Sequence, residues 1–355
     1  MAGNTPICWR IFPPWQRYNF VLMIRPFIGV CFAMVLAVAA GLMWPLAGGQ
    51  EAGVEIRAVA RLFPDVGAGL EAVKRDAGGK YYLAAAGWHG VAIYDADGKN
   101  VGQIPNENSG EATIESAADI DIDAEGRLLV LDRGASAVKI FSADGSLQAT
   151  VPVAAATYVA ALARGEFAVS AAGANPAIYI YDGHGKRVQT FESLPAAPRQ
   201  LALHHYVSLG IMCGDLSGHF YFAYAFLPDP VIRKYDRSGY ALYEIPIHSD
   251  EIIGGQDRLR DALSPDRQQV PAAKPGINAL AVDPATKEVW AAIGNTLVVF
   301  DKQGKRRAAF RAFTPEGARL EPHTILVEPE RILLGADPLG IFAFARPERG
   351  RAAAR

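Results

Sequence analysis

The sequence contains few cysteines, few histidines and almost no net charge. Its 355 residues include 3 cysteines and 7 histidines, and 35 basic residues nearly balance 37 acidic ones. Cys8 and Cys31 lie near the N-terminus, so Cys213 stands alone from residue 50 onward, which excludes an internal disulfide and a cysteine-based zinc site in that part of the chain. A net charge of −2 gives no electrostatic case for binding nucleic acid.

Several catalytic and cofactor motifs are missing as well. No serine lies in a Gly-x-Ser-x-Gly elbow, no glycine-rich stretch carries the lysine of a phosphate-binding loop, and no Cys-x-x-Cys-His segment could attach haem. The sequence therefore predicts no cofactor and favours a protein that is not an enzyme.

Charge is also absent from one long stretch near the N-terminus, Pro26–Leu46, which reads PFIGVCFAMVLAVAAGLMWPL. Arg10, Arg17 and Arg25 precede it, and basic residues before an apolar run are typical of export signals. The run is also long enough to span a bilayer. We expect residues 1–49 to form a helical export signal or membrane anchor, with either Met1 or Met23 as the start. The rest would then be exported to the periplasm or an equivalent compartment and touch the membrane only through residues 26–46.

What the chain does contain is a repeated pattern of strand, tight turn and strand. The segments VAIYDADGKNVGQI, VKIFSADGSLQATVPV, IYIYDGHGKRVQTF, IRKYDRSGYALYEI and LVVFDKQGKRRAAF begin at residues 91, 138, 178, 232 and 297. Asp and Gly suit such turns because Asp bonds its own backbone and Gly accepts positive φ. Further alternating strands precede each segment, so one unit holds about four strands. Antiparallel units of four strands at this spacing are typical of propeller blades.

The two ends of the chain indicate how the ring closes. The last unit, ending in GIFAFARPERG, has three strands, whereas Val54–Phe63 is a strand with no unit of its own. We therefore predict an all-β, six-bladed β-propeller over residues 50–346, in which Val54–Phe63 becomes the outer strand of the last blade. Residues 347–355 would form a disordered basic tail.

One blade carries a motif close enough to suggest a family. ADIDIDAEGRLLVLDRGASAVKIFSADG, residues 118–145, resembles an NHL repeat in its Asp-x-x-Gly turn, hydrophobic strand, loop aspartate and closing glycine turn. The resemblance implies a six-bladed NHL-like propeller, in a superfamily shared with SMP-30-like lactonases and amidating lyases. Binding proteins, lyases and hydrolases all use this fold, so the fold alone does not decide the function.

The candidate site is the rim of the propeller where the inner strands begin. Loops between second and third strands reach this rim and carry Trp88, His89 and Arg133, and Asn278 precedes an inner strand. We expect these four residues to bind an envelope protein or a small ligand. Other polar residues near the starts of the inner strands are Glu71, Asp119, Tyr158, Gln200 and His323.

The alternative function is a metal-dependent hydrolase, lactonase or lyase in the central channel. Glu71 and Asn278 resemble two of the metal ligands of the lactonases, and His323 weakly resembles a zinc histidine of the amidating lyases. In this hypothesis Glu71, Asn278 and His323 hold a divalent metal and Asp119 acts as the base. The lactonase pattern lacks its third ligand here, because the strand after Asn278 runs VWAAIGN without an aspartate.

Overall fold

The computed structural model describes residues 53–106, 110–172, 178–191, 209–226, 230–247 and 275–347. The chain divides into two compact units, Met1–Gln50 and Glu51–Arg355, and everything below concerns the second. The predicted export segment and the basic tail lie outside the described residues. Within the described ranges, no helix has the length and apolar character needed to cross a membrane.

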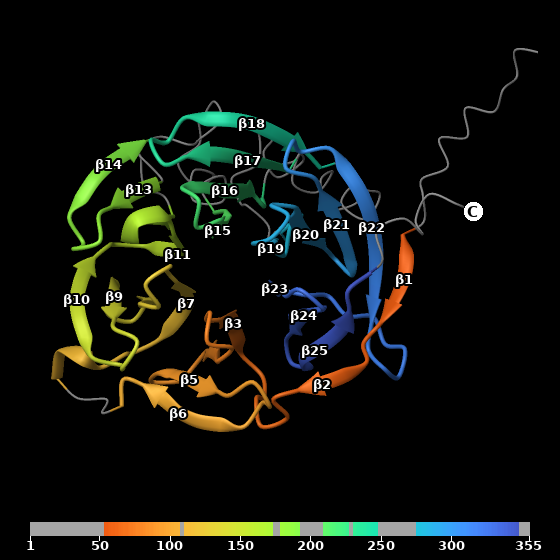
Figure 1. Ribbon diagram of the computed structural model, residues 1–355, viewed down its shortest axis with the longest axis horizontal. Coiled ribbons are helices and arrows are strands. Elements are labelled where there is room, and N and C mark those ends of the chain that lie inside the picture. The colour runs from red at the N-terminus through yellow and green to blue at the C-terminus, as the bar shows by residue number, and fades with distance from the viewer. Residues whose placement is uncertain are drawn as a thin grey trace, which may run out of the picture. The chain divides into compact units, whose positions relative to one another are not determined.

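The second unit is built from six separate sheets arranged in a ring (Figure 1). Each sheet is one blade and, except for one added strand, has four strands in antiparallel order. The first three blades are β3–β6 (Leu70–Arg75, Tyr81–Ala85, Val91–Tyr94, Asn100–Ile104), β7–β10 (Ala117–Ile122, Leu128–Asp132, Ala137–Phe141, Leu147–Pro152) and β11–β14 (Ala156–Ala161, Phe167–Ala171, Ile178–Tyr181, Arg187–Phe191).

The other three blades complete the ring. Blade 4 is β15–β18 (Ile211–Gly214, His219–Tyr224, Val231–Asp236, Ala241–Pro246) and blade 5 is β19–β22 (Ala279–Val282, Val289–Ile293, Thr296–Phe300, Arg306–Phe313). Blade 6 contains β23–β25 (Thr324–Val327, Arg331–Ala336, Gly340–Ala345) together with β2 (Ala60–Leu62). Helix in the described part is confined to two 3-10 turns, Gly110–Ala112 and Ala163–Gly165. The predicted all-β, six-bladed architecture is confirmed.

The turns between third and fourth strands have the geometry that their sequences predict. The repeated glycine has a positive φ in all five, between 79° and 87°: Gly98, Gly145, Gly185, Gly239 and Gly304. In the first blade, Asp95 Oδ1 accepts hydrogen bonds from the amides of Asp97 and Lys99, at 3.1 and 2.9 Å. The same pair of bonds recurs at Asp182, Asp236 and Asp301. The repeated turn is therefore one structural unit, and its carboxylates are used to hold backbone.

The N-terminal strand closes the ring, but over a shorter length than predicted. Arg61 pairs with Phe342 in an antiparallel ladder, so β2 is the outer strand of blade 6, as expected. The residues before β2 belong to a different blade. They form β1 (Val54–Arg57), which pairs in parallel with β22 and adds a fifth strand to blade 5 (Figure 1). The prediction of one continuous strand was wrong because the chain changes blades at Ala58 and Val59, whose amides bond to Phe313 and Ala343 respectively.

The core is divided among the junctions between blades. The buried apolar side chains form six clusters within the described residues, and each cluster joins two neighbouring blades. The recurring aromatic residues of the third strands are buried in them, as the in-register pattern indicates: Tyr94, Phe141, Tyr181, Tyr235 and Phe300. Because one twisted sheet cannot bury both of its faces alone, stacking the blades supplies the missing contacts.

The inner strands surround the axis of the ring, which is where the sequence predicts a channel. Each contacts the next around the ring, β3 to β7, β11, β15, β19, β23 and back to β3. In blade 4 the inner strand is β15, whereas the sequence suggested one near Gln200, a residue that lies outside the described ranges. The strand that begins at the channel mouth in this blade is therefore Ile211–Gly214.

Candidate functional site

The β4–β5 loop, Ala86–Gly90, carries two of the predicted binding residues. It is held at its base by hydrogen bonds from the Ala86 amide to the Gly69 carbonyl, 2.6 Å, and from the Trp88 amide to the Ala85 carbonyl, 3.0 Å. His89 is exposed, and Trp88 is partly buried against the core between blades 6 and 1. The loop therefore presents an imidazole and an indole from a fixed backbone.

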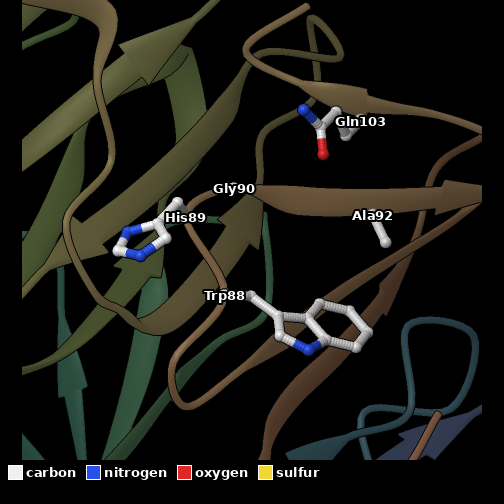
Figure 2. Close-up of a pocket in the computed structure, with 5 residues that line it drawn as sticks. All are labelled: Trp88, His89, Gly90, Ala92 and Gln103. Carbon is white, nitrogen blue, oxygen red and sulfur yellow. The ribbon is translucent and has the colours of Figure 1, made fainter. Parts of the chain in front are cut away.

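Trp88 and His89 line a pocket of about 310 Å³, together with Gly90, Ala92 and Gln103. Figure 2 shows the Trp88 indole and the Gln103 side chain on opposite sides of the first residues of β5, with His89 on the far side of the loop. Ala92 and Gln103 are paired across β5 and β6, which fixes their positions relative to each other. Two of the four predicted binding residues thus share a pocket, and Arg133 and Asn278 are not among its lining residues.

Arg133 lies in the β8–β9 loop, which is fixed by the buried carboxylate of Asp132. Asp132 accepts hydrogen bonds from the amides of Glu115 and Ser116 and forms an ion pair with Lys139 at 3.1 Å. Burial raises the pKa of Asp132, but these hydrogen bonds outweigh it and the net effect lowers the pKa. Arg133 itself is exposed, and its positive charge acts on Glu71 and Tyr158 across the channel mouth.

Two of the three predicted metal ligands, His323 and Asn278, form hydrogen bonds with backbone groups, and the third, Glu71, is partly buried. His323 Nδ1 accepts from the Asp337 amide at 3.2 Å, and its Nε2 donates to the Leu70 carbonyl at 2.6 Å. Asn278 Oδ1 accepts from the Gly294 amide at 3.2 Å. Burial raises the pKa of Glu71, and the charge of Arg133 partly offsets this effect. In this arrangement a metal ion would have to displace a structural hydrogen bond at His323.

Among the described residues, no group of three or more His, Cys, Asp or Glu side chains is placed to hold a metal ion. This finding does not test the predicted set of Glu71, Asn278 and His323, because asparagine is not among those four residue types. The metal site therefore stays a prediction.

On the inner strands, four polar groups from three blades lie close together. Lys74 Nζ is 3.0 Å from Asp121 Oδ1. The carboxylates of Asp119 and Asp121 accept hydrogen bonds from the Val159 and Ala161 amides, at 2.9 and 2.8 Å. Those amides belong to β11, so blade 2 satisfies polar backbone of blade 3. Cys213 contributes a buried thiol whose pKa is raised by burial.

Asp119 is the most strongly perturbed carboxyl of this group. Burial raises its pKa to about 7, against the opposing effects of the Lys74 charge and the Val159 amide. Burial also raises the pKa of Tyr158, helped by the negative charges of Asp119 and Glu71. The inner strands therefore hold a buried carboxyl with a raised pKa beside a lysine, a setting suited to proton transfer.

Sequence reasoning found Asp119 and missed Lys74 and Asp121. Asp121 could have been inferred, because residues two apart on a strand face the same side. Lys74 carried no such signal, since its approach to Asp121 depends on how blades 1 and 2 meet. Gln103 pairs with Ala92 across the β5–β6 hairpin, so the register of that hairpin could have placed it.

The raised pKa of Asp119 predicts a pH-dependent stability. The folded state binds this proton more tightly than the unfolded state, so the stabilisation is complete below the ordinary pKa of 3.8 and is lost as the pH rises toward 7. Relative to Asp119→Asn, which cannot ionise, the wild-type free energy of unfolding should fall by up to roughly 4 kcal/mol between pH 4 and pH 7. Urea unfolding at both pH values measures this, with Asp97→Asn in an exposed turn as the control. A difference between wild type and Asp119→Asn that does not change with pH would contradict the assignment.

Comparisons with known proteins agree with this architecture. No protein-family model matches the chain, and no curated protein matches its sequence. Solved structures are similar to it in fold. A streptogramin B lyase aligns with a TM-score of 0.50 and 12% identity, covering 79% of this chain and 84% of that one. The WD40 repeats of RRP9 give 0.51 and 10%, covering 82% and 99%, and U3-55K gives 0.52 and 11%, covering 79% and 96%.

At such low identities the likeness shows the fold alone. The class of protein is therefore a six-bladed β-propeller, in keeping with the NHL-like propeller predicted from its repeats. Propellers of this kind include both lyases and binding scaffolds, and the residues of the site have to decide between them.

Proposed function

We propose that this protein is an exported β-propeller that binds a protein partner or a small ligand in the cell envelope. The binding face is the one that carries Trp88, His89, Arg133 and Asn278. The observation that carries the proposal is the pocket of about 310 Å³ beside the β4–β5 loop, which combines a partly exposed indole with an imidazole and an amide. Aromatic side chains with a few polar neighbours are typical of binding sites.

The location in the envelope is proposed from the N-terminal sequence. The basic residues before the uncharged stretch Pro26–Leu46 support export, and the same stretch would serve as an anchor if it is retained. No metal or other cofactor is needed for binding at this face.

The proposal predicts which side chains a partner depends on. Trp88→Ala and Arg133→Ala, made in the full chain, should each reduce the recovery of a partner crosslinked in envelope fractions by about tenfold or more, because aromatic and arginine side chains carry most of the energy of interfaces. Tyr240→Ala is the matched control, since Tyr240 is 72% exposed on the β17–β18 turn. Quantitative mass spectrometry of the crosslinked material gives the readout. Equal recovery from all three variants and the wild type would overturn the proposal.

A second candidate is supported by the state of the channel. Asp119, with its pKa of about 7, lies near Lys74 and Tyr158, a setting suited to proton transfer in a lyase or hydrolase. The fold is shared with a streptogramin B lyase, so streptogramin B is a reasonable first substrate to test. Turnover that is lost in Asp119→Asn would favour this candidate. For the metal version, a Glu71→Gln protein that keeps the full metal content of the wild type would remove Glu71 as a ligand.

A further inference from the structure

The pocket beside the β4–β5 loop has an unusual composition for a surface hollow. Its lining residues are Trp88, His89, Gly90, Ala92 and Gln103, and none of them is Asp, Glu, Lys or Arg. One wall is therefore apolar and aromatic, whereas Gln103 offers a neutral amide that donates and accepts hydrogen bonds. A charged ligand would lose its hydration here without gaining a counter-charge.

The pocket lies beside the core between blades 6 and 1. Leu62, the last residue of the three-residue strand β2, packs against this core, as do Trp88 and Ala92. Trp88 thus rests on this core, and the pocket opens beside it. The walls are also set in place before any ligand arrives, by the Trp88 amide bond to Ala85 and by the pairing of Ala92 with Gln103. Preformed walls reduce the ordering cost of binding.

We infer that this pocket binds one neutral saccharide ring. This inference deepens the proposed function and rests on it. A pyranose ring has C–H groups on one face and hydroxyl groups around its edge. The C–H face fits the indole of Trp88, and the hydroxyl groups fit the amide of Gln103, which donates and accepts hydrogen bonds. The volume of about 310 Å³ is at the small end for ligand pockets, which suits one ring better than a chain of them.

A planar aromatic ligand fits less well. Such a ring has two apolar faces and an apolar edge, so it could contact Trp88 but would form no hydrogen bond with Gln103. A flexible acyclic polyol has the hydroxyl groups of a sugar but no ring face to place on Trp88. Sorbitol therefore makes a suitable negative control for the saccharide.

The test is calorimetric titration of the full chain with the methyl glycosides of glucose, galactose, mannose and N-acetylglucosamine, and with sorbitol. We expect saturable binding of at least one glycoside below about 20 mM and none of sorbitol. Trp88→Ala should weaken that binding by about tenfold or more and Gln103→Ala by a few fold, whereas Tyr240→Ala should leave it unchanged. Because Gln103 is exposed, its replacement tests the pocket even if Trp88→Ala weakens the fold.

The outcomes separate this inference from the function on which it rests. If no glycoside binds, or if sorbitol binds equally well, the saccharide assignment is wrong. If in that case a crosslinked envelope partner is still lost in Trp88→Ala, the proposed binding function stands without a sugar ligand. If neither measurement depends on Trp88, both proposals fail. Binding that is lost in Trp88→Ala and weakened in Gln103→Ala supports both.

Discussion

Replacing Asp132 by alanine is expected to lower the free energy of unfolding by about 3–5 kcal/mol, because it leaves a buried cation without its partner. Asp132 has no exposed surface, and Lys139 beside it is 5% exposed. The same change removes the carboxylate that accepts hydrogen bonds from the amides of Glu115 and Ser116. Urea unfolding followed by circular dichroism measures the loss.

Two further variants make this result interpretable. Asp144→Ala alters an aspartate that lies in an exposed hairpin turn of the same blade, so it should change the stability little. Lys139→Met removes the cation and keeps the carboxylate bonded to backbone amides, so its loss should be smaller than that of Asp132→Ala. If Asp132→Ala unfolds at the same urea concentration as Asp144→Ala, the aspartate does not hold the loop as described. Since Arg133 follows Asp132 directly, the loss should also weaken any binding at that loop.

Phe63→Ala should destabilise the ring closure to a similar extent, by about 3–5 kcal/mol, the usual cost of removing a buried phenyl ring. Phe63 is 2% exposed and follows the closing strand β2. Its ring meets Tyr81 and Tyr94 edge-on, with centroids 5.2 and 4.8 Å apart. Thermal and urea unfolding of the variant test this expectation.

The control for the closure lies a few residues earlier. Val59 is 68% exposed, so Val59→Ala shortens a side chain next to the seam without opening a cavity. An equal effect of the two substitutions would show that Phe63 does not anchor blade 1 to the closing strand. A large effect of Phe63→Ala alone would show that the seam is stabilised by packing beyond its three residue pairs.

The features that could be predicted from the sequence are those determined by residues close together in the chain. The turn at Asp95 and Gly98 needs one positive φ and one aspartate near it, and both are visible locally. Four strands per repeat follow from the spacing of such turns. The ring then follows because a single blade leaves both of its faces uncovered. For this reason the number of blades and the use of an N-terminal strand to close them were correct.

The places where prediction failed depend on contacts between distant segments. In VEIRAVARLF the apolar residues stay two apart through Ala58, and only Val59, at a position where Glu55, Arg57 and Arg61 are polar, interrupts the alternation. The break exists because the Ala58 amide reaches blade 5 and the Val59 amide reaches blade 6. Likewise, the inner strand of blade 4 is the short segment Ile211–Gly214, which has fewer strand-like features than the residues before it.

The candidate site shows the same division. Trp88 and His89 are adjacent in one loop that the repeat places at the rim, and they do line one pocket. His323 and Asn278 also looked available, but the backbone groups of Asp337, Leu70 and Gly294 occupy their polar atoms. Such partners come from neighbouring strands and blades, so the free or engaged state of a polar side chain cannot be deduced from its place in the repeat.

Because β1 pairs with blade 5, the strand that closes the ring is β2, which begins several residues after the start of the described chain. Cleavage or fraying that reaches Arg57 removes only the parallel pairing of β1 with β22 and leaves β2 on β25. Blade 5 also keeps its own four strands without β1. The ring therefore does not need β1 to close, so proteolysis before Ala58 would leave the β2–β25 pairing intact.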